Sequence, residues 1–121
     1  MKKADLGAAD FLRHFRGAAD RVLEYTAGAS EEEFLATPIM QDAVIRNIEI
    51  IGKATNNLIE VSPDIAIRYP SIPFAQIYGM RNRVAHGYFA VSLSMIWDSV
   101  EVDVPELRTQ IAKVLEDLKG A

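Results

Sequence analysis

Apolar side chains recur every three or four residues along most of this chain, and this spacing constrains the fold more than any other feature. The first such stretch contains Phe11, Phe15, Ala18, Val22 and Tyr25, which would share one face of an α-helix. Further stretches with the same period follow. The sequence therefore predicts an all-α protein, a compact antiparallel helical bundle of about five helices with additional short helical turns.

Residues that cap or end helices divide the first half of the chain. Gly28 is expected to end the first helix. A Ser-x-x-Glu capping box predicts a short helix over 30–35. Thr37 and Pro38 begin a long helix over 38–60. Its broad apolar face predicts that it is the central helix of the bundle.

The second half is divided in the same way. A short helical turn is expected within 62–70, between two prolines. The next helix is expected over 73–85, with Gly87 following its end. The last helical region begins near Ser92 or Ser94 and keeps a four-three apolar spacing to Leu118. Pro105 must kink or divide it, because the proline ring clashes with the preceding turn.

Length and composition narrow the class of protein. A chain of 121 residues predicts a single domain over 1–121. It contains no cysteine, which excludes disulfides and cysteine metal sites and fits a reducing compartment. No apolar run reaches membrane-spanning length, and the first residues lack the apolar core of a signal peptide. We therefore expect a cytoplasmic protein with no membrane partner.

The charge distribution bears on nucleic-acid binding. The net charge of −4 argues against a general nucleic-acid binder, so no DNA partner is expected. The acidic run Glu31–Glu33 contrasts with residues 79–89, which hold two arginines and no acid. A small phosphate site on an acidic body is therefore compatible with the sequence.

The stretch Gly79-Met-Arg-Asn-Arg-Val-Ala-His-Gly-Tyr-Phe89 carries the most chemistry. Histidine is the side chain best suited to move protons near neutral pH, and His86 lies there near a helix end, where a cation is favoured. Arginine clamps phosphate well, and Arg81 precedes His86 by five residues. Tyr88 adds a hydroxyl two residues later. This combination indicates phosphodiester chemistry.

The spacing of these residues favours a shared site. On an ideal helix Arg81 and His86 would point about 140° apart, so they converge only if the helix end unwinds or if two chains meet. RNA cleavage by its own 2′-hydroxyl needs a base, an acid and a cation on the phosphorane. One histidine cannot easily be both acid and base in one step, so a homodimer with two copies of His86 and Arg81 in one cleft is expected. The four-three apolar stripe of the last helix is a second indication of a two-fold interface.

Nearly the whole chain resembles the HepT-like HEPN proteins, the toxin half of the HEPN/MNT toxin–antitoxin modules. The similarity extends over Phe34-Leu35, Gln41–Gly52, Tyr69–Pro73, Gly79–Phe89, Trp97 and Asp103–Leu107.

The resemblance implies roles for four residues. Arg81 and His86 match the family's Arg-x4–6-His ribonuclease motif, and Asn82 matches the supporting polar residue after the arginine. Tyr88 matches the tyrosine that a cognate minimal nucleotidyltransferase modifies with AMP. The resemblance thus implies a metal-independent endoribonuclease toxin that is dimeric and acts on RNA. It further implies a type VII-like module in which AMPylation by the nucleotidyltransferase antitoxin silences the toxin.

Three positions depart from the family pattern. Lys53 replaces a more usual Glu, Phe74 replaces a common Trp, and Gly87 stands where Asp is frequent. None of the three is a motif residue. Lys53 puts in doubt any role tied to that Glu, and it changes a charge on the long helix.

Other residues have simpler interpretations, and one alternative function stays open. His14 is expected to be a surface histidine, and Trp97 a packing aromatic. No residue has metal-ligand spacing to His86, so neither a metal nor a cofactor is expected. The alternative function is a non-catalytic HEPN module that binds a nucleotide or a partner enzyme, which the acidic net charge mildly supports.

Overall fold

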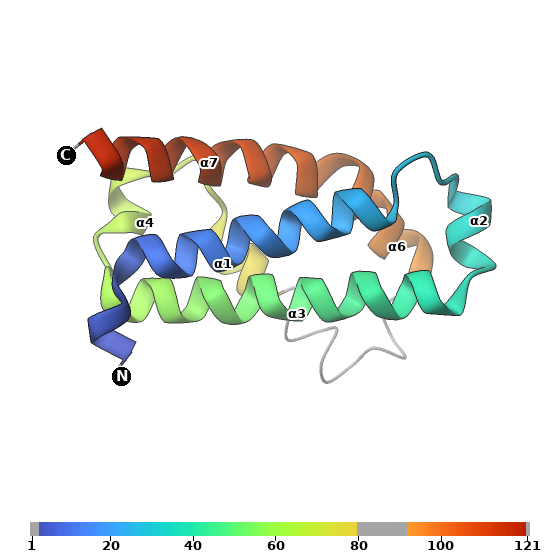
Figure 1. Cartoon of the computed structure of the whole chain (residues 1–121), viewed down its shortest axis with the longest axis horizontal. Helices are drawn as coiled ribbons and strands as arrows, with labels where there is room; N and C mark the ends of the chain where they lie inside the picture. The colour runs from blue at the N-terminus through green and yellow to red at the C-terminus, as the bar shows by residue number, and fades with distance from the viewer. Residues whose placement is uncertain (1–2, 80–91, 121) are drawn as a thin grey trace.

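Three long helices run along the molecule in the computed structural model, which describes residues 3–79 and 92–120 (Figure 1). These are α1 (Lys3–Tyr25), α3 (Pro38–Val61) and α7 (Val104–Gly120). The helix α1 packs along both α3 and α7 and runs antiparallel to each of them. The prediction that the 38–60 helix is central is therefore wrong. The apolar faces of α1 and α3 look alike in sequence, and only packing distinguishes the helix with two long neighbours.

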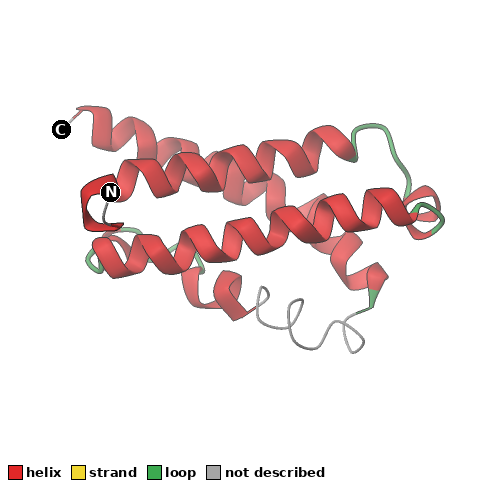
Figure 2. Ribbon diagram, turned by 60° about the horizontal axis from the view of Figure 1, so that its bottom comes forward, coloured by secondary structure: helices red, strands yellow, loops and turns green. Residues whose placement is uncertain are grey.

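Shorter helices connect the long ones. They are α2 (Glu31–Leu35), α4 (Ile65–Arg68), a helical segment at residues 74–79, α6 (Leu93–Asp98) and a π-helical segment (Ser99–Asp103). Figure 2 shows helices and loops, without a strand, throughout the described ranges. The predicted all-α bundle is confirmed.

Local sequence signals explain where the first helices begin and end. In α2 the Ser30 side chain accepts a bond from the Glu33 N–H, while the Glu33 side chain accepts from the Ser30 N–H. This is the predicted capping box. Pro38 occupies the first turn of α3, where its missing N–H costs nothing. Two glycines take positive φ angles, Gly28 (76°) after α1 and Gly7 (72°) at a kink within α1.

The last helical region is divided just before Pro105, as predicted. The Val104 N–H donates to the Ser99 carbonyl, one residue further back than in an α-helix. This wider π turn gives room to a proline ring that would otherwise meet the preceding turn. The chain then continues as α7, and Figure 1 shows α6 and α7 meeting at an angle.

One apolar core joins these elements. Its largest fully buried side chains include Phe15 of α1, Leu58 of α3 and Ile111 of α7. At one end of the bundle, Phe34 of α2 and Trp97 of α6 pack ring on ring, with centroids 5.3 Å apart. Trp97 is therefore the packing aromatic that the sequence predicts.

The apolar stripe of the last helical region also belongs to this core. Val100, Val104, Ile111 and Val114 are each at least 96% buried within the single chain. The stripe is thus used against the chain's own helices. It gives no support to a two-fold interface, although the sequence analysis offered it as an indication of one.

Candidate functional site

The predicted motif residues Arg81, Asn82, His86 and Tyr88 lie outside the described residues, as does Gly87. The structure therefore describes the segments that lead into and out of this motif. It also describes the surfaces that surround those segments on the bundle.

The segment that leads into the motif is held by buried apolar side chains. Ile72, Phe74 and Ile77 are only 5–7% exposed. The Phe74 N–H donates to the Ile72 carbonyl at 2.9 Å, which tightens the turn before the helical residues 74–79. Phe74, which departs from the family's common Trp, thus fills a core position. The segment before the motif is therefore packed firmly onto the bundle.

The segment that follows the motif is fixed by a helix cap and by a core aromatic. Ser92 is extended (φ −73°, ψ 147°), and its side chain accepts a bond from the Met95 N–H at 3.1 Å. Ile96 and Trp97, in the second half of α6, are buried. The chain is therefore well packed both before and after the motif segment.

A cavity of ≈ 490 Å³ lies beside the entry segment, between α3 and the start of α7. Its polar lining includes Gln76, Asp103, Glu106 and Gln110. The Gln110 Oε1 atom is buried without a hydrogen-bond partner in the described part of the chain. Among the described residues that line this cavity there are two carboxylates and no lysine or arginine, so this part of the lining does not attract a phosphate group.

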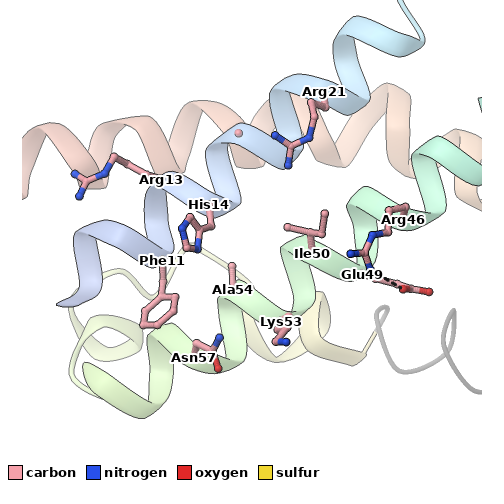
Figure 3. Close-up of a pocket in the computed structure, with 11 residues that line it drawn as sticks. Phe11, Arg13, His14, Arg21, Arg46, Glu49, Ile50, Lys53, Ala54 and Asn57 are labelled. Carbon is pink, nitrogen blue, oxygen red and sulfur yellow. Dashed lines mark ion pairs between the residues drawn. The ribbon is translucent and has the colours of Figure 1, made fainter. Parts of the chain in front are cut away.

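A second hollow, of ≈ 660 Å³, lies between α1 and α3 and has the opposite charge. Arg13 and Arg21 of α1 line it together with Arg46 and Lys53 of α3, and Glu49 is its one carboxylate among the residues described. Figure 3 shows His14 and Arg21 projecting from α1 on the side that faces α3. We call this hollow the α1/α3 groove.

The α1/α3 groove contains two residues that the sequence analysis named for other reasons. Lys53, the departure from the family's Glu, is an exposed residue of the groove. His14 is exposed, as predicted, and its ring meets that of Phe11 edge-on with centroids 6.0 Å apart. The sequence analysis assigned neither residue to a shared surface.

Sequence reasoning missed the arginines of the groove. A signal was present, because Arg13, Gly17 and Arg21 recur at four-residue spacing and so share a helix face. Arg46 and Lys53, seven residues apart, also share a face. The sequence alone does not show that these faces of α1 and α3 lie against each other.

Within the described parts of the chain, two titratable groups show shifted pKa values, and both lie near α4. The hydrogen bond from the Ser62 hydroxyl, with help from Arg68, lowers the pKa of Asp64. Loss of water contact and the hydrogen bond to Asp117 raise the pKa of Tyr69. The Tyr69 hydroxyl donates to the Asp117 carboxylate at 3.0 Å and so ties the end of α4 to α7. Neither group lines the cavity or the groove.

Within residues 3–79 and 92–120, no three His, Cys, Asp or Glu side chains cluster as metal ligands would. None of the helices described is both long and apolar enough to cross a membrane.

Comparison with known proteins relates the chain to a family of ribonucleases. Residues 15–114 match the family described as "Ribonuclease HepT-like", and this span includes the whole Arg81–Tyr88 motif. No solved structure matches the chain.

Individual relatives match along most of their length. "Putative RNase MJ1216" of Methanocaldococcus jannaschii is 32% identical over 120 residues, covering 99% of this chain and 95% of the relative. "Probable ribonuclease HepT" of Thermococcus cleftensis is 33% identical over 105 residues, covering 87% of this chain and 93% of the relative. "Putative RNase TTE0752" of Caldanaerobacter subterraneus is 31% identical over 109 residues, covering 90% of this chain and 95% of the relative.

Proposed function

The chain belongs to the HepT-like ribonuclease family, and from this premise we propose that it is a metal-independent endoribonuclease toxin. Its activity would be held in check by a nucleotidyltransferase antitoxin that transfers AMP to Tyr88. The observation that carries the proposal is the family match over residues 15–114, which contains an intact Arg81, Asn82, His86 and Tyr88.

The proposed reaction is attack by a ribose 2′-hydroxyl on the adjacent phosphorus. The 2′-oxygen forms a bond to phosphorus, and the bond from phosphorus to the 5′-oxygen of the next nucleotide breaks. The 2′-hydroxyl loses a proton to a base, and the leaving oxygen gains one from an acid. His86 has the chemistry for proton transfer, and Arg81 for stabilising the charged phosphorane. The products carry a 2′,3′-cyclic phosphate and a 5′-hydroxyl.

We propose that two chains build this site together. Each chain supplies one motif histidine, whereas the reaction uses both a base and an acid. A two-fold dimer that places both copies of His86 and Arg81 in one cleft would supply all the roles. Asn82 would support the arginine.

The test is cleavage of a long single-stranded RNA in the presence of excess chelator. Wild-type protein should cleave it and leave 2′,3′-cyclic phosphate ends. His86→Ala and Arg81→Ala should each lose nearly all activity, since general acid–base assistance is typically worth ~10²–10⁴ in rate. Unchanged circular dichroism spectra and unfolding temperatures in both variants would separate lost chemistry from lost folding.

Two outcomes would contradict the proposal. Full activity in His86→Ala would exclude the motif histidine from the reaction, and loss of activity on chelation would exclude a metal-independent reaction. A wild-type protein that binds a nucleotide or a nucleotidyltransferase but cleaves no RNA would favour the alternative of a non-catalytic HEPN module, for which the net charge of −4 is the supporting observation.

A further inference from the structure

Positive charge on this acidic chain is gathered in the α1/α3 groove. Arg13, Arg21, Arg46 and Lys53 give the groove lining four positive charges, and Glu49 gives it one negative charge, for a net +3. The whole chain carries −4 with its histidines neutral, so all other residues together carry −7. Such a local surplus attracts anions although the molecule as a whole repels them.

Only part of this surplus is neutralised by nearby acids. Arg13 pairs with Asp10 at 2.6 Å, and Arg46 is 4.0 Å from Glu49. Among the described residues, no carboxylate forms an ion pair with Arg21 or Lys53. These two cations remain available to an incoming phosphate.

A buried amide positions Arg21 without cancelling its charge. The Arg21 Nε–H donates to the Asn47 Oδ1 atom at 2.8 Å, and the Asn47 amide donates to the Ala43 carbonyl at 2.8 Å. Asn47 is only 4% exposed, so this arrangement is fixed within the fold. Because this partner is a neutral amide, it orients the Arg21 guanidinium and leaves its positive charge uncancelled, whereas a carboxylate partner would have neutralised it.

The size of the groove suits a chain of phosphates better than one small anion. Arg13 and Arg21 are eight residues apart, which is about 12 Å along α1, and Arg46 and Lys53 are seven apart, about 10 Å along α3. Gly17, between the two α1 cations, adds no side chain to the hollow. The exposed His14 ring beside these cations offers a face on which a base can stack.

We propose that the α1/α3 groove binds the sugar-phosphate backbone of single-stranded RNA and so guides substrate on the surface of the bundle. This inference rests on the proposed ribonuclease function for the identity of the anion. Its recognition is electrostatic, and no base sequence is read in the groove.

The test is binding of a fluorescent 12-nucleotide 2′-O-methyl RNA, which lacks the attacking hydroxyl and so binds without being cleaved. The groove variant is the double substitution Arg46→Gln with Lys53→Gln. Its matched control is Arg68→Gln with Lys113→Gln, which removes one arginine and one lysine at exposed positions outside the groove. Arg68 matches Arg46 in a second respect, because each lies near a carboxylate a few residues away in sequence. Arg68 is 3.5 Å from Asp64, and Arg46 is 4.0 Å from Glu49.

The groove variant should bind the RNA about tenfold more weakly by fluorescence anisotropy at low salt, and the control should stay within about twofold. The slope of log K against log salt should fall by about 1.4 in the groove variant, because each lost phosphate contact contributes about 0.7 for a single strand. Equal affinities in the two variants would overturn the proposal. So would effective competition by polyglutamate, which would point to an acidic protein partner instead.

Cleavage by wild-type protein distinguishes failure of this inference from failure of the proposed function. If wild type cleaves RNA and the two variants bind equally well, only the groove proposal falls. If wild type cleaves nothing while the groove variant alone loses RNA binding, the ribonuclease proposal falls and the groove remains an RNA-binding surface.

Discussion

At the scale of single residues, polar side chains set positions that the apolar core alone would leave loose. Asn47 is buried and joins Arg21 of α1 to its own helix. The hydroxyl of Thr55, which is also buried, donates a hydrogen bond to the Ile51 carbonyl. Tyr69 connects two segments that are 48 residues apart in sequence through Asp117. Each of these groups has a partner, as a buried or half-buried polar group requires.

The Tyr69–Asp117 bond gives a pH-dependent prediction. Because the pKa of Tyr69 is raised, the bond favours the neutral phenol and stabilises the fold fully below the unfolded pKa, about 10. This stabilisation disappears as the pH rises through the higher folded pKa. Tyr69→Phe should therefore lower the free energy of unfolding by about 0.5–1 kcal/mol at pH 8, a small value because the hydrogen bond is exposed to solvent. At pH 11 the loss should be smaller. Urea titrations at both pH values measure the difference.

The control for this prediction is Tyr25→Phe. Tyr25 is 44% exposed, and its hydroxyl has no hydrogen-bond partner among the residues described. It should change stability little at either pH. A Tyr69→Phe effect that is as large at pH 11 as at pH 8 would contradict the assigned role of the phenol hydrogen bond.

Tyr88 gives a prediction about regulation. An AMP group there would place a phosphate and a nucleotide close in sequence to Arg81 and His86, and would compete with RNA phosphate for their charge. Tyr88→Phe should keep most of the ribonuclease activity but escape silencing by the cognate nucleotidyltransferase. Co-expression followed by intact-mass measurement and a growth assay tests this. Wild-type protein that gains no AMP, or Tyr88→Phe that is silenced equally well, would exclude the role.

At the scale of elements, short helices depend on their caps because few hydrogen bonds hold them. The helix α6 has six residues and follows the motif segment directly. Ser92 satisfies the Met95 N–H at its start, and Trp97 anchors its far side on Phe34 of α2. The cap and the aromatic contact together determine where the chain re-enters the bundle.

Ser92→Ala should therefore lower the free energy of unfolding by about 1 kcal/mol, the usual cost of losing an N-cap. Ser94→Ala is the matched control, since Ser94 is an exposed serine of the same helix and caps nothing in the described structure. It should not lower the free energy of unfolding, because alanine is a better helix former than serine. Thermal unfolding followed by circular dichroism compares the two variants, and equal effects would show that the cap contributes nothing.

At the scale of the whole molecule, the proposed shared cleft requires two chains. Four residues of the apolar stripe of the last helical region (Val100, Val104, Ile111 and Val114) are buried within one chain and so are not free for a partner. A dimer would have to use other surfaces. Sedimentation at micromolar concentration should give about twice the chain mass of 13.4 kDa.

A mixing experiment tests whether the cleft is shared. An excess of His86→Ala protein, allowed to exchange subunits, should lower wild-type activity well below that seen with the same excess of albumin, because mixed dimers would lack one histidine. A strictly monomeric wild type, or activity unaffected by the excess, would contradict the composite site.

Sequence patterns predicted the parts of the fold that depend on local chemistry. The Ser30–Glu33 box, Pro38 and Pro105 each act through neighbouring backbone atoms, and each lies where it was expected. The central position of α1 and the meeting of its arginines with Lys53 depend on how helices pack. Period and spacing identify a helix face but do not identify the face opposite to it. The assignments of Arg81, Asn82, His86 and Tyr88 stay predictions.

The π turn at Ser99–Asp103 sets the rotational phase between α6 and α7. One residue of α-helix corresponds to 100° of rotation, so a single extra residue in one turn changes which side the preceding segment presents. If one residue of this turn were deleted and the region became continuous α-helix, α6 would rotate by about 100° relative to α7. Trp97 would then leave Phe34, while α7 kept its own contacts. Relatives that lack this residue should therefore carry their large aromatic side chain at a neighbouring position of α6.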